Sequence, residues 1–533
     1  MSHLSKPSTD RRAITLAMSC LGVFIAYLPI TTVAISLPAI QEAMHTSTAQ
    51  LAWVQDAFVL PLAAFVLTAG VFGDVHGRKK VFSAGLLLAA AGAAVALCAT
   101  TIQVLWAGQV LAGLGSAALL PTTLALISHA VPDPRERGKF IGLWAMALLA
   151  ALAVGPVIAG VILDHAAWRW IYLLPIPAAL LALAAAARLL PDSHAAHGRR
   201  LDWPGQLTAT LAITALVYGV IEGGAGSFTD ARVLIALALG AIALVGFVLI
   251  ERRSTSPMLN LALFRSPAFT ATALVALISF LALIGFFFAL SLYFGMVQQL
   301  DTLHAAARLI LVPLAAIAAG GPVGRLMHRV PARHLITGGL LVITAALALL
   351  TTLDTDTSFV SAGWRLVLLG VGMGVVMTPM TAVAVGAVPR SLAGMASAGN
   401  NAFRQIGSAL GPAVLGTLLS AKATATLGAH LTASGVTGSL HRQVVATADA
   451  SGLGAVAHLS LGASAGQVYA ALGDSLLDGL RLCLVVAAVL NAVAAACALI
   501  LLREPRTTVA TATATRHDHP AETVSAGAPG KEG

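Results

Sequence analysis

Apolar residues follow one another in long stretches along this chain, and short segments that hold most of the charged residues separate them. A helix needs about 20 apolar residues to cross the roughly 30 Å hydrocarbon layer of a membrane. Fourteen stretches are long enough, over approximately residues 13–37, 51–73, 81–101, 105–127, 140–163, 170–189, 204–221, 233–250, 269–294, 305–325, 334–353, 364–388, 402–420 and 479–502. Because lipid offers the backbone no hydrogen-bond partners, each stretch is expected to be a helix. The pattern predicts an all-α integral membrane protein with fourteen transmembrane helices.

Composition agrees with this pattern, and the positions of the basic residues orient it. Hydrophobic residues make up 58% of the 533 residues, and charged residues make up only 10%. Short loops rich in Lys and Arg stay on the cytoplasmic side of a membrane. If the N-terminus is cytoplasmic, the outer side holds only seven of the 31 Lys and Arg, namely Arg169, Arg232, Arg308, Arg365, Lys422, Arg442 and Arg481. The sequence predicts cytoplasmic N- and C-termini, and the net charge of +9 reflects this topology rather than binding to nucleic acid.

Two short basic segments indicate an internal repeat. GVFGDVHGRK begins at Gly70 and follows the second predicted helix, while GRLMHRVPAR begins at Gly324 and follows the tenth. Each would lie on the inner side after the second helix of a six-helix group, as parallel repeats in a transporter require. The predicted organisation is a cytoplasmic N-terminus (1–12), a six-helix bundle (13–189), two extra helices with cytoplasmic links (190–268), a second six-helix bundle (269–502) and a disordered cytoplasmic tail (503–533). The second bundle includes a long external loop at 421–473, rich in Ala, Thr, Gly and His, which we expect to be mobile and to lack a core.

The first basic segment resembles the loop motif G-x-x-x-D-x-x-G-R-K of the major facilitator superfamily. Its residues here are Gly70, Gly73, Asp74, Gly77, Arg78 and Lys79. Other segments resemble the fourteen-helix drug:proton antiporter family within that superfamily, among them WVQDAFVLPLAAFVLTAGVFGD, VLAGLGSAALLPTTLALI, AVGPVIAGVILDHAAWRWIYLL and AGMASAGNNAFRQIGSALGPAVLGTLL. The resemblance extends over about residues 14–502 and implies the major facilitator fold, in which two six-helix halves rock about a central site. It also implies that Asp74, Arg78 and Lys79 brace the outward-open state.

The fifth predicted helix carries a motif that marks exporters in this family, here Gly155, Pro156 and Gly160. Proline removes a backbone donor and bends a helix, and glycine lets a partner helix approach closely. The alternative is that these residues only bend the helix so that it packs against its neighbours.

The chain also departs from the family's pattern. Pro29 and Ala34 stand where members often carry an acid and an asparagine in helix 1, and Gln109 replaces a helix 4 arginine that is commonly tied to proton transfer. Pro175 replaces a usual asparagine, and Val75 replaces a usual basic residue after the loop aspartate. Gln109 is a candidate for the cavity or a gate. These departures leave open whether proton coupling uses the common arrangement.

Ionisable groups inside a membrane span are functional candidates, because burying a charge in lipid is costly. Asp56 is the only acid predicted within a span and away from its ends, and Arg308 and Arg365 are the only cations expected to approach it. We interpret Asp56 as a proton-coupling or cation-recognition acid; the alternative is an interfacial acid wetted by the outer vestibule. Arg404 and Gln405, near the inner start of helix 13, either gate the cytoplasmic mouth or anchor that helix among headgroups.

No enzymatic constellation is evident in the sequence. A phosphate-binding GxxxxGK[ST] sequence, an HExxH sequence and a metal-ligand spacing of cysteines are all missing, so neither a cofactor nor a metal is expected. We interpret the chain as a monomeric transporter of the bacterial cytoplasmic membrane that exports small amphiphilic drugs or antibiotics in exchange for protons. One alternative is a dedicated exporter of a single antibiotic or metabolite, and another is a non-transporting membrane sensor.

Overall fold

The computed structural model describes residues 9–44, 46, 48–131, 134–190, 201–225, 227–388, 392–459 and 461–502. Within these ranges the chain is almost entirely helical, and fourteen segments are long and apolar enough to cross a membrane. This confirms the predicted number of spans. The predicted tail at 503–533 and residues 1–8 of the predicted N-terminal segment lie outside the described residues.

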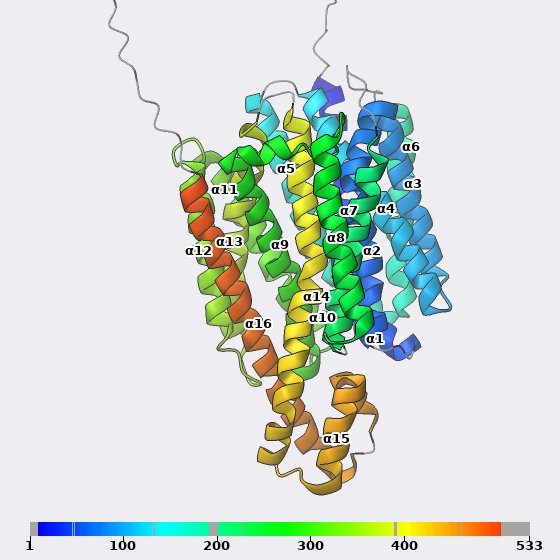
Figure 1. Ribbon diagram of the computed structural model, residues 1–533, viewed down its shortest axis with the longest axis vertical. Helices are drawn as coiled ribbons and strands as arrows, with labels where there is room; N and C mark the ends of the chain where they lie inside the picture. The colour runs from blue at the N-terminus through cyan, green and yellow to red at the C-terminus, as the bar shows by residue number, and fades with distance from the viewer. Residues whose placement is uncertain are drawn as a thin grey trace, which may run out of the picture. The chain divides into compact units, whose positions relative to one another are not determined.

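The helices fall into two groups of six spans with two spans between them (Figure 1). The first group consists of α1 (Thr9–Met44), α2 (Thr48–His76), α3 (Arg78–Leu97), α4 (Ile102–Ala130), α5 (Pro134–His165) and the 3₁₀ turn η1 (Trp168–Tyr172) with α6 (Pro175–Leu189). The extra pair is α7 (Trp203–Ala225) and α8 (Ala231–Arg253). The second group consists of α9 (Pro267–Leu292), α10 (Thr302–Leu309) with α11 (Leu311–Leu326), α12 (Ala332–Leu350), α13 (Phe359–Gly386), α14 (Ala393–Ala433) and α16 (Ala465–Leu501), and the short α15 (Gly438–Ser451) precedes α16.

The same packing occurs in both groups. In the first, α4 lies against α2 and α3, α5 against α1, and α6 against α3; in the second, α13 lies against α11 and α12, α14 against α9, and α16 against α12. The two groups, which we call the N-half and the C-half, meet where α5 contacts α10 and α11 and where α14 contacts α2. The repeated packing supports the parse into six, two and six helices.

Small residues allow these helices to lie close together. Along the contact between α3 and α4, a Cβ on Gly115 would lie 2.6 Å from the Ala89 nitrogen, and one on Gly108 would lie 2.7 Å from the Ala96 nitrogen. Membrane helices associate through such close backbone approach, since lipid provides no hydrophobic force between them.

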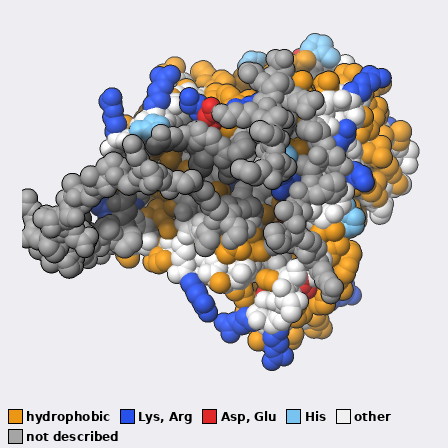
Figure 2. Space-filling model, turned by 90° about the horizontal axis from the view of Figure 1, so that it is seen from above, with side chains coloured by type: hydrophobic (Ala, Val, Ile, Leu, Met, Phe, Trp, Pro, Cys, Tyr) orange, Lys and Arg blue, Asp and Glu red, His pale blue; other side chains and the backbone are white. Residues whose placement is uncertain are grey.

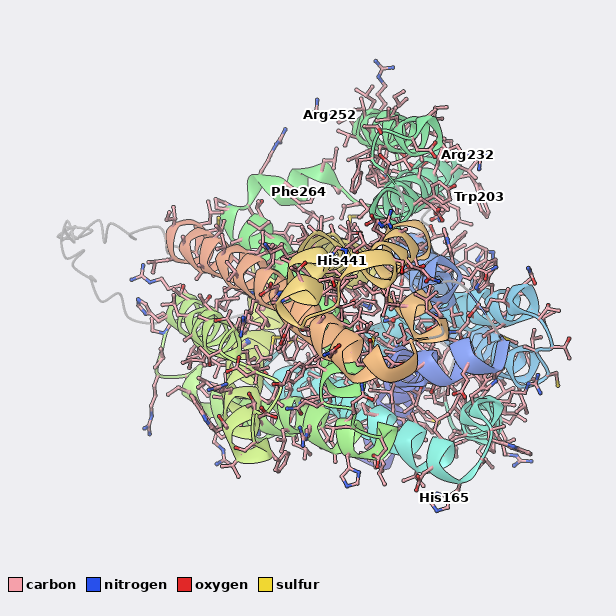
Figure 3. All side chains as sticks on the ribbon, turned by 90° about the horizontal axis from the view of Figure 1, so that it is seen from below. His165, Trp203, Arg232, Arg252, Phe264 and His441 are labelled. Atoms are coloured by element: carbon pink, nitrogen blue, oxygen red, sulfur yellow. The ribbon has the colours of Figure 1, made fainter. Side chains whose placement is uncertain are left out.

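The extra pair lies along the seam between the halves. α7 contacts both α2 and α14, while α8 packs on α7 and leaves most of its side chains exposed. Gln206 of α7 donates to the Ala64 carbonyl of α2 (3.2 Å), and Thr417 of α14 donates to the Val220 carbonyl of α7 (3.3 Å). Trp203, Arg232 and Arg252 of this pair lie at one side of the bundle (Figure 3).

The segment at 421–473 differs from the expectation of a mobile loop without a core. α14 continues to Ala433, α15 follows, and α16 begins at Ala465, so that most of the segment is helical. Its buried apolar residues include Leu427, Leu431, Val444, Val456 and Val468, and they are continuous with the core of the bundle. Alanine favours helix more than any other residue, and a few well-spaced Leu and Val suffice to pack three short helices. We call this part the cap.

The tenth predicted span is broken where a continuous helix was expected. α10 ends at Leu309 and α11 begins at Leu311. Pro313 has no N–H to donate to the Leu309 carbonyl, which removes one hydrogen bond at the break.

Basic side chains gather at one end of the bundle. α1 begins and α16 ends at the upper end in Figure 1, opposite the cap. Figure 2 looks onto this upper end, where lysine and arginine side chains stand around the rim and outnumber the visible acidic ones. It is the end that the charge count predicts to be cytoplasmic, and the orientation itself stays a prediction.

Candidate functional site

Asp56 lies inside α2 with its carboxyl group buried. The residue is 2% exposed, and its Oδ1 has no hydrogen-bond partner among the described residues. None of the lysines and arginines that the structure describes lies within ion-pair distance of it. In this structure the carboxyl group is enclosed by protein rather than wetted by a vestibule.

The two arginines that were expected to approach Asp56 have other neighbours. The Arg308 guanidinium donates to the side chain of Gln298 and lies 5.3 Å from the centre of the Phe294 ring. Arg365 lies 5.6 Å from the centre of the Trp364 ring, and its Nε and Nη1 are buried without a partner in the described part of the chain. The structure does not bring these cations together with Asp56.

Three of the positions that depart from the family's pattern line one cavity in the N-half. Pro29 of α1, Gln109 of α4 and Pro175 of α6 surround a space of about 20 Å³ together with Tyr172 and Ser116. Gln109 is buried, and its Nε2 donates to the Val54 carbonyl of α2 (3.0 Å). The Tyr172 hydroxyl is buried without a partner among the described residues. The cavity has room for about one water molecule and is lined by no carboxylate or arginine.

The loop motif ties the turn between α2 and α3 to two neighbouring helices. Arg78 pairs with Asp74 (Nη2 to Oδ1, 3.1 Å) and donates to the Ala125 carbonyl of α4 (3.3 Å). Lys79 donates to the Ala187 carbonyl of α6 (2.8 Å). Gly77 has φ of 105°, a conformation that a side chain disfavours, so glycine is required at the turn. The structure pairs Asp74 with Arg78 and ties Lys79 to α6, and the bracing of an outward-open state stays a prediction.

The helix motif of α5 contacts both halves. A Cβ on Gly155 would overlap the Thr31 hydroxyl of α1, and a Cβ on Gly160 would lie 3.0 Å from the Leu303 Cα of α10. Pro156 lies within the helix between these contacts. The close approach that was expected of these glycines is present, and it places α5 between α1 and the C-half.

Arg404 and Gln405 are buried inside α14. Because α14 begins at Ala393, Arg404 lies about three turns from its start. Its Nη2 donates to the Thr381 hydroxyl of α13, and the guanidinium lies 5.6 Å from the centre of the Phe280 ring of α9. Gln405 donates to the Tyr27 hydroxyl of α1 (2.7 Å) across the two halves. A headgroup anchor is therefore wrong for these residues, because neither side chain reaches the surface of the bundle.

A sequence model of the Major Facilitator Superfamily matches residues 19–412 of the chain. The chain belongs to this superfamily. The multidrug resistance protein Stp of Mycobacterium tuberculosis is 34% identical over 420 residues, which are 78% of each chain. The tetracenomycin C resistance and export protein of Streptomyces glaucescens is 32% identical over 492 residues, which are 91% of this chain and 90% of the relative.

Solved structures of the major facilitator superfamily agree on the fold. A bacterial homolog of the human lysosomal transporter Spinster, solved in an inward-facing and unoccupied conformation, matches 93% of this chain and 98% of its own with a TM-score of 0.57. The two sequences are 18% identical, so this likeness shows the fold alone.

The major facilitator repeat contains a second helix motif that the sequence prediction missed. Gly411, Pro412 and Gly416 of α14 repeat the spacing of the α5 motif, GPAVLG against GPVIAG. A Cβ on Gly411 would lie 2.7 Å from the Leu281 carbonyl oxygen of α9, as the first glycine of the α5 motif lies against α1. The signal was present in the sequence, and a comparison of α5 with α14 would have found it.

Proposed function

We propose that this protein is a secondary active transporter of the bacterial cytoplasmic membrane that exports small amphiphilic drugs or antibiotics in exchange for protons. The names of the two relatives, a multidrug resistance protein and a resistance and export protein, support export of such compounds. The repeated halves support alternating access, in which the halves rock about a central site. The observation that carries proton exchange is Asp56, a buried carboxyl group without an ionic partner in the described part of the bundle.

The position of Asp56 suits this role. Proton exchange needs a titratable group that each side of the membrane can reach in turn. α2 contacts α14 of the other half, so Asp56 belongs to a helix at the seam that opens and closes. The cavity lined by Pro29, Gln109 and Pro175 contains no carboxylate that could replace it.

Asp56→Asn tests the proposal in everted membrane vesicles. The variant is expected to lose uphill, proton-driven accumulation of a fluorescent drug, because its side chain cannot take up a proton. Downhill exchange of the same drug and the amount of protein in the membrane should stay unchanged. Asp164→Asn is the matched control, since Asp164 is exposed at the end of α5. If the Asp56→Asn variant still accumulates the drug against a gradient when a pH difference is imposed, coupling lies elsewhere and a sodium-driven or uncoupled mechanism is the better account.

A dedicated exporter of one compound is the second candidate, and the relative that exports tetracenomycin C supports it. A growth-inhibition panel of antibiotics in a pump-deficient host separates the two. Protection against several unrelated compounds indicates a multidrug exporter, and protection against one indicates a dedicated exporter.

A further inference from the structure

α14 presents a buried polar face whose hydrogen-bonding groups are incompletely satisfied. Asn401, Arg404 and Gln405 are spaced three and four residues apart, which places them on one side of the helix. All three are buried. Both side-chain polar atoms of Asn401, the Nε of Arg404 and the Oε1 of Gln405 have no hydrogen-bond partner among the described residues. Buried polar atoms are nearly always paired in proteins, so a group of unpaired side-chain atoms on one buried face is typical of a surface that binds a ligand.

Arg404 gives this face a positive charge that nothing nearby balances. It is 4% exposed, and no carboxylate in the described ranges lies within ion-pair distance. Its contacts are the Thr381 hydroxyl and the Phe280 ring. Arginine stays protonated in proteins, and a buried charge without a partner is costly. An anion is therefore the ligand whose charge suits this face.

The internal repeat shows that the fold does not need a polar face at this place. Counting back from the Gly-Pro pair of each motif, Arg404 corresponds to Leu148 of α5 and Gln405 corresponds to Leu149. Both leucines are buried in the core of the N-half. Because leucine fills the equivalent positions, packing alone does not account for the polar residues of α14.

The polar face lies where the two halves meet. Gln405 reaches across to the Tyr27 hydroxyl of α1, and α14 also contacts α2 of the N-half. When the halves separate on one side of the membrane, this contact opens. The polar face then becomes accessible to a molecule that enters from that side. The Phe280 ring beside the guanidinium provides an apolar surface for the rest of that molecule.

We propose that Asn401, Arg404 and Gln405 form an anion-recognition site, and that the exported amphiphiles are acids that carry a carboxylate or phenolate beside a hydrogen-bonding group. Arg404 is the counter-ion, and the amides of Asn401 and Gln405 bond the neighbouring polar group. This inference rests on the proposed export function and names its substrate class. It has an electrical consequence: an anion moving outward and a proton moving inward both carry positive charge into the cell, so an inside-negative potential drives both movements.

The test uses the purified full-length protein and vesicles that contain it. Salicylic acid and 3-hydroxy-2-naphthoic acid are each compared with their own methyl esters, which keep the ring system and its hydroxyl group but carry no charge near neutral pH. The acids should raise the midpoint of thermal unfolding and be accumulated by everted vesicles, faster when the potential favours anion export. The esters should do neither. In Arg404→Gln the apparent affinity for the acids should fall roughly 10- to 100-fold, the effect of one charge-assisted hydrogen bond.

Two further variants separate recognition from structure. Arg404→Lys keeps the charge but loses the planar fork, so its affinity for the acids should be intermediate. Arg252→Gln removes an exposed arginine from the end of α8 (Figure 3) and should behave as the unmodified protein does. Without any acid, Arg404→Gln should unfold at an unchanged or higher temperature, because an unbalanced buried charge has been removed. A lower midpoint would mean that Arg404 serves structure rather than recognition.

Several results would overturn the proposal. Equal binding of acids and esters, or no stabilisation by any acid, excludes an anion site. Chloride is also tested without any acid. If chloride raises the midpoint of thermal unfolding in an Arg404-dependent way and the acids raise it no further, the site binds an inorganic anion. Proton-driven export of an ester while the acids are neither bound nor moved leaves the proposed function standing without this substrate class. Arg404-dependent binding of the acids without export of any compound leaves the site standing and refutes the transport function.

Discussion

At the scale of single residues, Asp56 and Arg404 are two of the buried ionisable groups that lack an ionic partner in the described part of the bundle, and the structure does not pair them with each other. Asp56 belongs to α2 of the N-half, and Arg404 belongs to α14 of the C-half. Had the two paired, each would have neutralised the other. Their separation leaves the carboxyl group available to protons and the guanidinium available to an anion.

The Asp74–Arg78 pair supports a prediction at this scale. Asp74→Asn should slow drug efflux several-fold while leaving drug affinity nearly unchanged. The reason is that the pair holds the turn between α2 and α3, which touches no candidate substrate residue, and each charge-assisted hydrogen bond contributes about 1.5–3 kcal/mol. Efflux rates and equilibrium binding of one dye measure the two effects. Loss of affinity with a normal transport rate would contradict this assignment.

At the scale of elements, α5 and α14 are counterparts that carry the same Gly-Pro motif and differ in polarity. Each lies against the first helix of its own half, and each also contacts the other half. α5 is apolar before its motif and α14 is polar there. α5 therefore provides an apolar contact surface between the halves, and α14 provides the polar groups that we propose recognise a ligand.

Gly411→Ala tests the close approach at the second motif. The added methyl group would lie 2.7 Å from the Leu281 carbonyl oxygen, so α9 and α14 must move apart. Overpacking of this kind costs about 1–3 kcal/mol, and the midpoint of thermal unfolding in detergent should fall. Gly321→Ala in α11 is the control, because a methyl group there meets nothing within 4 Å. Equal midpoints for the two variants would show that the contact at Gly411 is not tight.

The sequence predicted elements better than it predicted their surroundings. Hydropathy predicted all fourteen spans, since each contains about 20 apolar residues. The motif spacings predicted the tight turn between α2 and α3 and the close approach of helices at α5. Hydropathy missed the continuation of α14 and α16 into the cap, because Ala- and Thr-rich helices of low hydropathy look like loops. It also missed that Pro29, Gln109 and Pro175 share one cavity. These positions lie on three helices, and only the packing of α1, α4 and α6 brings them together.

At the scale of the whole molecule, the two ends of the bundle differ in character. One end carries the basic rim of Figure 2, and the other carries the cap, where α15 with its His441 lies in front of the bundle in Figure 3. If the basic end is cytoplasmic, the cap faces the outside of the cell.

Cysteine labelling in intact cells tests this orientation. Gln443→Cys on α15 should react with a membrane-impermeant thiol reagent, and Arg252→Cys at the end of α8 should be protected, since both positions are exposed but lie at opposite ends. The background variant needs Cys98→Ser, because Cys98 is the exposed member of the four free cysteines. The reverse labelling pattern would invert the topology.

α14 extends from the bundle into the cap, so a movement of this helix in the bundle also moves the cap. The helix has 41 residues, and the part from Arg404 to Ala433, which includes Pro412, extends about 43 Å at 1.5 Å per residue. A rotation of a few degrees near Arg404 therefore becomes a displacement of about 2–4 Å at Ala433. If the cap faces the outside of the cell, an antibody fragment that binds α15 would prevent this movement. It would arrest the pump without entering the path that the substrate takes.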